Sequence, residues 1–408
     1  MRPFSRILPS FAATILTLTL AAHAQYPETV LYNFESTSTD ASVPEGVLNQ
    51  DALGNVYGAA QDGGAGGGAI FELSPSASGW SEQILYAFTG GSDGQYPNGG
   101  LVFDASGNIY GTTGRGGSYG DGIVFELSPT GTGTYTESVL YNFTGSTDGE
   151  FPTGGIVSDS SGNLYGTTAR GGTDDDGVVY KLSFTANNGW SEKVLYSFTD
   201  SSDGAVPDAG IVADAAGNLY GTTFIGGNSS CECGTVFRLT RATGWHFTVL
   251  HQFNGFDGRN PLSNLTFDSA GNAYGSAFQG GSKGYGTIYE LTPTTEGFWM
   301  PTILHSFTAG YDGASPVAPI TLDSAGNVYS TNDSGTQYAF GTAFELTPIA
   351  GGGWNYVRLH DFTNGADGGG PRSNLLLGAS GNIYGTTATG GTHPLGGTFY
   401  ELSPPPAK

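Results

Sequence analysis

The chain has 408 residues, with 13 Lys and Arg against 36 Asp and Glu, so its formal charge is −23 at pH 7. The 24 Phe, 22 Tyr and low charge density exclude a disordered chain, and the acidic balance argues against nucleic-acid binding because phosphates would be repelled. The 69 Gly show no period of three, which excludes collagen, and two Cys cannot make a disulfide framework.

The first 24 residues are predicted to be a secretory signal peptide. An arginine-bearing start and an apolar stretch over residues 7–22 precede Ala22-His23-Ala24, a small-x-small cleavage site. The stretch is too short for a transmembrane segment, and no second apolar run of about 20 residues follows. We therefore expect cleavage near Ala24 and secretion to the periplasm or the extracellular space. The mature chain would form a single domain over residues 25–408 with a charge of 11 − 36 = −25.

One sequence unit recurs seven times along the rest of the chain. Its first landmark is Val/Ile/Arg-Leu-Tyr/His, whose Leu recurs every 54 or 55 residues from Leu31 to Leu359. The motifs Gly-Asn-x-Tyr and Gly-x-x-Phe/Tyr-x-Leu-Ser/Thr recur with it in constant order, seven times each. Such a period indicates copies of one supersecondary unit packed beside one another.

Each unit contains four strand signals, a to d in chain order. In the third unit they cover residues 155–158, 163–168, 178–183 and 190–198. Four strands in about 50 residues are typical of a propeller blade, and no apolar run has helical periodicity. The sequence therefore predicts an all-β, seven-bladed β-propeller with four-stranded blades. The blades span about 43–88, 97–143, 152–198, 207–253, 261–307, 316–362, and 371–403 plus 26–34.

The two ends of the repeat region complement each other. Residues 26–34 match a strand d with no strand a, b or c before it, and the last unit stops after a strand c at 397–403. We expect the first strand to join the last blade and close the ring, because closure removes the exposed sheet edges.

The recurring aromatic and histidine positions have structural explanations. All five Trp begin a strand d, and this favours packing between neighbouring blades over a ring of sugar-stacking platforms. His251, His305 and His360 replace Tyr at one position of strand d. They lie in different blades, too far apart to share a metal ion.

An Asp occurs four residues before the Pro in every connection from strand d to strand a. The seven are Asp40, Asp93, Asp148, Asp203, Asp257, Asp312 and Asp367. A turn role is sufficient for them. Alternatively, these carboxylates share one face of the ring with the b-to-c loops and collect cations such as Ca²⁺, with Asp174, Asp175 and Asp176 as candidate metal ligands. We expect no other cofactor.

One position of the b-to-c loop varies within the constant frame. It lies four residues after the Gly of strand b and holds Asp62, Arg115, Arg170, Ile225, Gln279, Ser334 and Thr389. We take Asp62, Arg115, Arg170 and Gln279 as candidate ligand-binding residues. Arg115 and Arg170 are candidates to hold a carboxylate or sulfate, and the alternative is two ordinary surface arginines in a tolerant loop.

Two further sets of residues belong to these loops and to the channel. Cys231 and Cys233 lie in the longest b-to-c loop, and a disulfide that staples this loop is expected outside the cell. Strand a is mostly apolar or Gly where it faces the channel, with Glu45, Asn264 and Asn374 as polar exceptions.

The repeat frame resembles the Gloeo/Verruco ("GloVer") tandem-repeat family of secreted bacterial proteins. The resemblance rests on Val-Leu-Tyr-x-Phe, Asp-Gly-x-x-Pro, Gly-Asn-Leu-Tyr-Gly-Thr-Thr and Gly-Thr-Val-Phe, and it covers about residues 29–403. It implies a secreted propeller and no particular activity. The blades are more loosely similar to those of NHL-type propellers, which mainly bind partners.

These observations favour a secreted, monomeric binding scaffold for an extracellular protein or polysaccharide, with no nucleic-acid partner and no transmembrane segment. The alternatives are an extracellular propeller enzyme, such as a polysaccharide lyase or lactonase, and a purely structural protein of the cell envelope. The enzyme alternative rests on fold analogy, because the sequence contains no Ser/His/Asp set and no HExxH motif.

Overall fold

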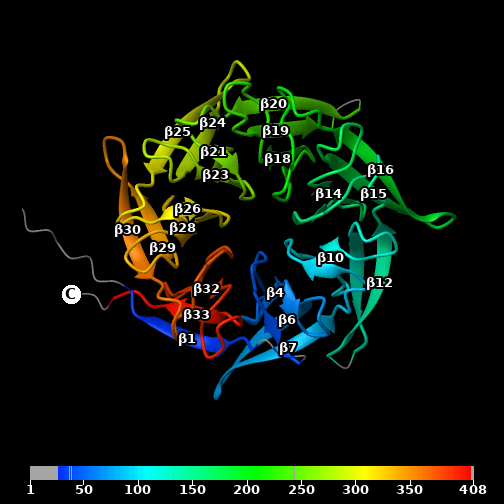
Figure 1. Ribbon diagram of the computed structural model, residues 1–408, viewed down its shortest axis with the longest axis horizontal. Helices are drawn as coiled ribbons and strands as arrows, with labels where there is room; N and C mark the ends of the chain where they lie inside the picture. The colour runs from blue at the N-terminus through cyan, green and yellow to red at the C-terminus, as the bar shows by residue number, and fades with distance from the viewer. Residues whose placement is uncertain (1–25, 36, 38, 132, 242–243, 406–408) are drawn as a thin grey trace, which may run out of the picture.

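The computed structural model describes residues 26–35, 37, 39–131, 133–241 and 244–405, and its sheets are arranged in a ring (Figure 1). The predicted all-β, seven-bladed propeller is confirmed. The expected signal peptide, residues 1–24, lies outside the described residues. In the described ranges, no helix is long and apolar enough to cross a membrane.

The first four blades follow one another around the ring. Blade 1 contains β3 (Asn49–Gln50), β4 (Val56–Ala60), β6 (Ala69–Ser76) and β7 (Gly79–Ala87), with β2 (Ala41–Ser42) paired to β5 (Asp62–Gly63) beside it. Blade 2 contains β8 (Gln95–Pro97), β9 (Val102–Phe103), β10 (Ile109–Arg115), β11 (Ile123–Pro129) and β12 (Tyr135–Asn142). Blade 3 contains β13 (Val157–Ser158), β14 (Leu164–Thr168), β15 (Val178–Thr185) and β16 (Gly189–Ser197). Blade 4 contains β17 (Val212–Ala213), β18 (Leu219–Thr223), β19 (Thr235–Thr240) and β20 (His246–Gln252).

The remaining three blades complete the ring. Blade 5 contains β21 (Arg259–Pro261), β22 (Thr266–Phe267), β23 (Ala273–Gln279), β24 (Thr287–Pro293) and β25 (Trp299–Ser306). Blade 6 contains β26 (Ala314–Pro316), β27 (Thr321–Leu322), β28 (Val328–Ser334), β29 (Thr342–Pro348) and β30 (Trp354–Asp361). Blade 7 contains β31 (Leu376–Leu377), β32 (Ile383–Thr387), β33 (Thr398–Leu402) and β1 (Glu28–Asn33).

The N-terminal strand closes the ring as predicted. β1 pairs antiparallel with β33, and Thr29 lies opposite Glu401 in that register. The backbone N–H of Tyr26 also donates to the carbonyl of Leu359 in blade 6 (2.9 Å). The first strand therefore completes blade 7 and ties it to its neighbour.

The Leu of the first sequence landmark marks a β-bulge in every blade. In blade 2, Val124 pairs with Tyr141 and Phe125 pairs with Val139, so Leu140 is the extra residue. The same register shift occurs in the other six blades. A bulge adds a residue and increases the local twist, which explains why this tripeptide recurs.

The innermost strands are shorter than the sequence predicts. The pattern places the start of strand a of blade 3 at Gly155, whereas β13 begins at Val157. The reason is close backbone contact between blades, since a Cβ on Gly154 would lie 2.7 Å from the carbonyl oxygen of Ala209. These glycines therefore allow neighbouring blades to approach closely around the channel, and they do not extend strand a.

The core lies between the blades, and the aromatic residues at the start of strand d contribute to it. The Trp80 ring lies 5.0 Å from that of Phe399 in blade 7, and the Trp245 ring lies 5.7 Å from that of Tyr165 in blade 3. These are edge-to-face contacts across blade interfaces, which supports the packing role expected from the sequence.

Candidate functional site

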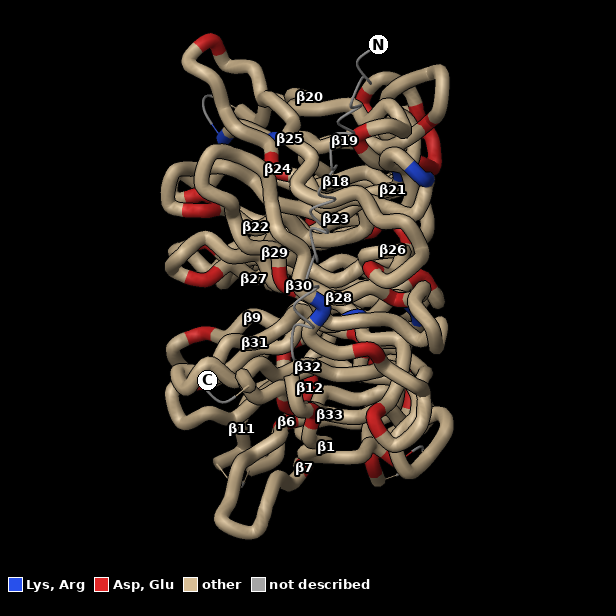
Figure 2. Tube along the Cα trace, turned by 90° about the vertical axis from the view of Figure 1, so that its left-hand side faces the viewer, with Lys and Arg blue, Asp and Glu red and all other residues tan. Residues whose placement is uncertain are grey.

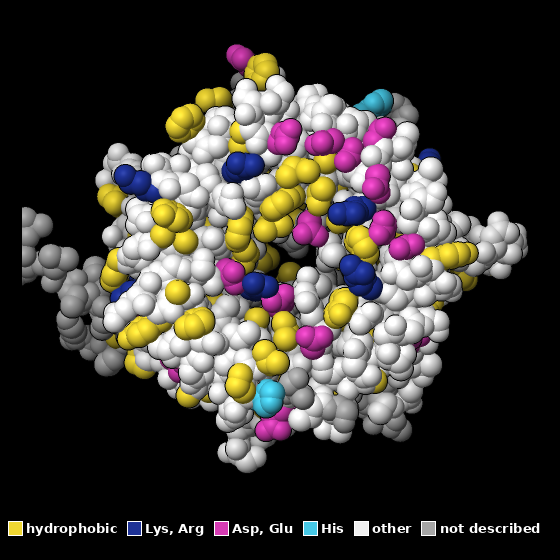
Figure 3. Space-filling model, in the orientation of Figure 1, with side chains coloured by type: hydrophobic (Ala, Val, Ile, Leu, Met, Phe, Trp, Pro, Cys, Tyr) yellow, Lys and Arg dark blue, Asp and Glu magenta, His cyan; other side chains and the backbone are white. Residues whose placement is uncertain are grey.

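The d-to-a and b-to-c connections lie on the same face of the ring, as expected. Glu150 and Arg170, one from each connection, exchange two backbone hydrogen bonds of 2.9 and 3.1 Å. Gly172 N–H also donates to the carbonyl of Ser146 (2.8 Å). We call this side the loop face, and Figure 3 shows it with the channel opening at its centre.

A hollow of about 390 Å³ occupies the channel opening on the loop face. Each blade contributes to it the residue that follows the Pro of its d-to-a connection. We call this set the mouth ring: Glu45, Asn98, Thr153, Asp208, Leu262, Val317 and Arg372. The scaffold is thus nearly constant from blade to blade, whereas the side chains around the opening all differ.

Arg372 joins three blades on one side of the opening. Its Nη1 lies 2.5 Å from Glu45 Oε1 in blade 1, and its Nε lies 2.8 Å from Asp333 Oδ1 in blade 6. Gln61 Nε2 donates to the other oxygen of Glu45 (3.0 Å). Burial raises the pKa of Glu45, although the charge of Arg372 acts against this shift. These two carboxylates are therefore already engaged by a cation.

The opening has a polar arc and an apolar arc. Thr153 donates a hydroxyl hydrogen bond to the Asp208 carboxylate, and Asn98 lines the same part of the hollow. Across from them, Leu262 and Val317 are accompanied by Phe278 and Pro319. Figure 3 shows this yellow apolar area beside the hole.

The other polar exceptions of strand a connect blades. Asn264 Oδ1 accepts a hydrogen bond from Gly210 N–H (2.7 Å), and Asn374 Oδ1 accepts one from Leu48 N–H (2.7 Å). Both amides therefore fasten one inner strand to the next. Of the three exceptions, Glu45 and Asn264 line the hollow, and Asn374 does not.

A second hollow of about 320 Å³ extends from the opening over blades 2 and 3. It shares three residues of the mouth ring with the channel opening: Asn98, Thr153 and Asp208. Its other side chains include Tyr96, Arg115, Phe151 and Val206. We call these seven residues the blade 2–3 groove. The guanidinium carbon of Arg115 lies 4.8 Å from the centre of the Phe151 ring, within the range of a cation–π contact.

The residue before the Pro of each d-to-a connection has a left-handed backbone. The φ angles lie between 55° and 59° for Val43, Tyr96, Phe151, Val206, Asn260 and Ser315, and the seventh position is Gly370. Such a φ is strained for β-branched and aromatic residues. At Phe151 the backbone is fixed by hydrogen bonds, since its N–H donates to Asp121 and its carbonyl accepts from Ala169. The ring thus holds Tyr96 and Phe151 in place on the loop face.

Only one of the four candidate ligand-binding residues lines the opening or the groove. Arg115 forms part of the groove. Asp62 lies on β5, next to a separate hollow beside Val43. Arg170 is exposed beside Glu150, and Gln279 is exposed at the end of β23.

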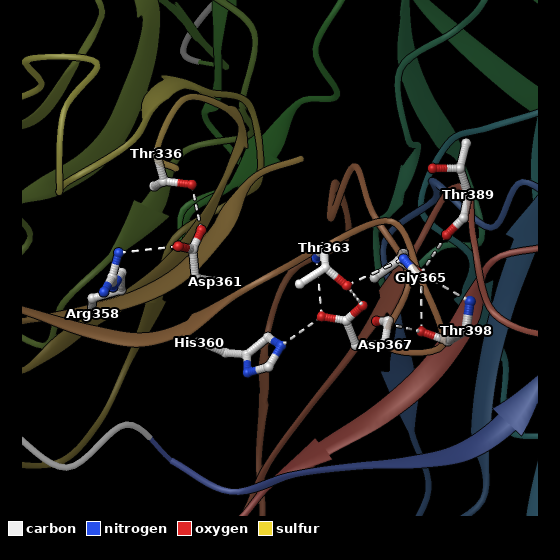
Figure 4. Close-up of polar contacts among 10 residues, drawn as sticks. Thr336, Arg358, His360, Asp361, Thr363, Gly365, Asp367, Thr389 and Thr398 are labelled. Carbon is white, nitrogen blue, oxygen red and sulfur yellow. Dashed lines mark hydrogen bonds and ion pairs between the residues drawn. The ribbon is translucent and has the colours of Figure 1, made fainter. Parts of the chain in front are cut away.

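The Asp of each d-to-a connection fastens the end of strand d. In Figure 4, the Asp367 carboxylate accepts from His360 Nε2 (3.2 Å) and from Thr363 N–H (3.0 Å). His251 and His305 contact Asp257 and Asp312 in the same way, and a Tyr hydroxyl does so in the other four blades. Burial raises the pKa of Asp367, but the His360 and Thr363 hydrogen bonds outweigh it and lower that pKa overall. The histidines are therefore Tyr replacements in a structural contact.

The three consecutive Asp residues of blade 3 lie in the b-to-c loop. Asp175 Oδ1 accepts a hydrogen bond from Gly171 N–H (3.0 Å). Burial and the charges of Asp200, Asp174 and Asp175 raise the pKa of Asp176. Among the residues that the structure describes, no group of three His, Cys, Asp or Glu is placed to hold a metal ion. Calcium binding here stays a prediction.

Cys231 and Cys233 form a disulfide in the b-to-c loop of blade 4. Cys233 is fully buried and packs in the core between blades 4 and 5 with Val236 and Phe253. The bond therefore fastens the longest b-to-c loop to the body of the ring.

Most residues of the mouth ring are not identified as candidate site residues from the sequence. The repeat pattern does not single out Arg372, Asp208 and their neighbours, although the position after Pro is as variable in the repeat as the position of Arg115. The variation at the position after Pro is the sequence feature that could have identified the mouth ring. Asp333 carries a weaker one, because it occupies a strand b position that is Gly or Ala in three other blades.

Comparisons with known proteins support the repeat architecture. The model of the Gloeobacter/Verrucomicrobia repeat matches residues 9–232 and 216–408. No curated protein matches the sequence. Among solved structures, a provisionally assigned oxidoreductase (glucose dehydrogenase) of Thermus thermophilus is 14% identical, with a TM-score of 0.45 over 92% of this chain and 99% of that one. This last similarity carries no argument about function.

Proposed function

The chain belongs to the Gloeobacter/Verrucomicrobia repeat family, and we propose that it is a secreted, monomeric binding propeller. It takes an extracellular polymer or protein partner on the loop face, centred on the channel opening and the blade 2–3 groove. The predicted signal peptide supports the secreted location.

The mouth ring is the observation that carries this proposal. Seven copies of one unit place seven different side chains at equivalent points around one opening. A purely structural ring needs no such variation at the position that lines the opening. Variable residues on a rigid scaffold are the usual arrangement of a binding face.

Binding is favoured over catalysis by the state of the acidic groups. Glu45 and Asp333, the carboxylates that flank the opening on one side, are both ion-paired with Arg372. Asp208 accepts a hydrogen bond from Thr153. The two ion-paired carboxylates are engaged and are not free to act as a general base or nucleophile on a substrate. Asp208 keeps acceptor capacity, which suits recognition of hydroxyl groups.

A binding panel tests the proposal. The mature chain, residues 25–408, is applied to immobilised extracellular polysaccharides and cell-envelope fractions, and bound protein is measured. We expect at least one member of the panel to retain it. The double variant Asn98→Ala with Asp208→Ala should lose at least tenfold in affinity, because two hydrogen-bonding groups of the polar arc are removed.

The matched control changes the opposite face of blades 2 and 3, over which the groove extends. Ser106 and Ser160 are exposed on the b-strand hairpins, and Ser106→Ala with Ser160→Ala should bind like the parent. Equal losses in both double variants, or none in either, would show that the loop face is not the binding surface.

A further inference from the structure

We propose that the blade 2–3 groove binds a uronic acid residue of an acidic polysaccharide, with Arg115 holding the carboxylate. This inference rests on the proposed function and names the ligand class for that face.

The Arg115 guanidinium is available for a ligand. It is exposed, lies over the Phe151 ring, and forms no ion pair with a carboxylate of any described residue. A guanidinium whose face rests on an aromatic ring keeps its N–H edge free for two parallel bonds to a carboxylate.

A second cation strengthens the local positive potential. Arg170 lies in the equivalent loop of blade 3, exposed and likewise without an ion pair among the described residues. Burial, Asp121 and Asp175 raise the pKa of Glu150, while the charges of Arg170 and Arg115 act in the opposite direction. Both guanidiniums are therefore close enough to act on one carboxylate. Figure 3 shows basic side chains on this side of the opening.

The rest of the groove suits a sugar ring. Tyr96 is 37% exposed and, with Phe151, offers aromatic surface to the apolar face of a pyranose. Asn98, Thr153 and Asp208 offer amide, hydroxyl and carboxylate groups to ring hydroxyls at the inner end. The volume of about 320 Å³ is at the small end of ligand pockets, which fits one or two residues of a chain.

An acidic peptide fits this groove less well. Peptides commonly add a strand to an open edge, and here the backbones already pair: Glu150 with Arg170, and Phe151 with Ala169.

Titration calorimetry with tetragalacturonate and its methyl ester tests the inference, because esterification removes the negative charges and leaves the sugar rings and their hydroxyl groups unchanged. We expect the parent protein to bind the acid at least tenfold more tightly than the ester. Arg115→Gln should bring the affinity for the acid down to that for the ester and leave the ester unchanged. Tyr96→Asn keeps a residue that tolerates the left-handed backbone and should weaken both sugars.

A charge-matched control is Lys193→Gln, which removes an exposed cation from outer strand β16 and should retain the preference for the acid. Equal binding of acid and ester by the parent protein, binding of neither, or an unchanged preference in Arg115→Gln would overturn the uronate assignment. In those cases the proposed function still stands if the Asn98→Ala and Asp208→Ala variant loses a partner found in the panel.

Discussion

At the scale of single residues, the contact between strand d and the Asp of the d-to-a connection is made by Tyr in some blades and by His in others. A carboxylate in each d-to-a connection accepts from Tyr in four blades and from His in three. The sequence indicates both the turn role of the Asp and the replacement of Tyr by His. It does not indicate the bond itself, because the partners lie six to eight residues apart across a turn whose geometry only the fold defines.

A half-buried Glu faces this contact at four blade interfaces. Glu28, Glu82, Glu137 and Glu192 occupy one position of strand d, where the other blades have Phe247, Pro301 and Tyr356. Burial and then Asp93 raise the pKa of Glu137 to about 7, and burial and then Asp148 raise that of Glu192 to about 7. Burial and then the Asp40 carboxyl raise the pKa of Glu82.

We predict that the protein loses stability as the pH rises from about 4.5 to about 7. An unfolded Glu titrates near 4.3, so within this range the folded state keeps protons that the unfolded state has released. The free energy of unfolding therefore falls as the pH rises towards the raised pKa. Above that pKa the loss of stability stays at its full size. Glu137→Gln with Glu192→Gln removes two such groups and should flatten the fall, making the variant more stable than the parent at pH 8 and similar at pH 4.5.

Urea unfolding across this pH range makes the measurement. Glu296→Gln, a change at an exposed turn, is the control and should keep the parent's slope. Parallel profiles for the parent and the double variant would contradict the prediction.

At the scale of elements, glycine sets how closely the blades approach. The sequence predicts strand a of blade 3 over residues 155–158, where Ile156 and Val157 precede a turn. The structure shortens it because the backbones of neighbouring inner strands are in contact, and contact between segments 55 residues apart cannot be read from local pattern.

Adjacent glycines in blade 2 give a matched test. A Cβ on Gly99 would lie 2.8 Å from the carbonyl oxygen of Gly154, whereas a Cβ on Gly100 would lie 3.4 Å from Val47, an ordinary contact. Gly99→Ala should therefore cost about 1–3 kcal/mol more stability than Gly100→Ala, because backbone atoms must move apart. Equal urea midpoints for the two variants would show that the inner strands are not in close contact.

At the scale of the whole molecule, seven similar blades form a ring whose loop face has different side chains in each blade. The repeat count, the four-stranded blades and the closing strand follow from the sequence because each landmark recurs in register. Acidic segments lie at loop tips on both faces (Figure 2). The Asp residues of the d-to-a connections lie at one end of the blades, and a second series in the a-to-b hairpins lies at the other: Asp51, Asp104, Asp159, Asp214, Asp268 and Asp323. Variation at one loop position identifies Arg115, whereas Asp208 and Arg372 need the ring, because only its closure places their positions around one opening.

The central claim is that the ligand binds on the loop face over blades 2 and 3. Hydrogen exchange of residues 25–408 with and without polygalacturonate tests it most directly. We expect slower exchange in residues 95–98 and 150–153, which carry Tyr96, Asn98, Phe151 and Thr153 into the groove. Protection confined to the opposite-face hairpins at residues 104–108 and 159–163, or no protection at all, would contradict it.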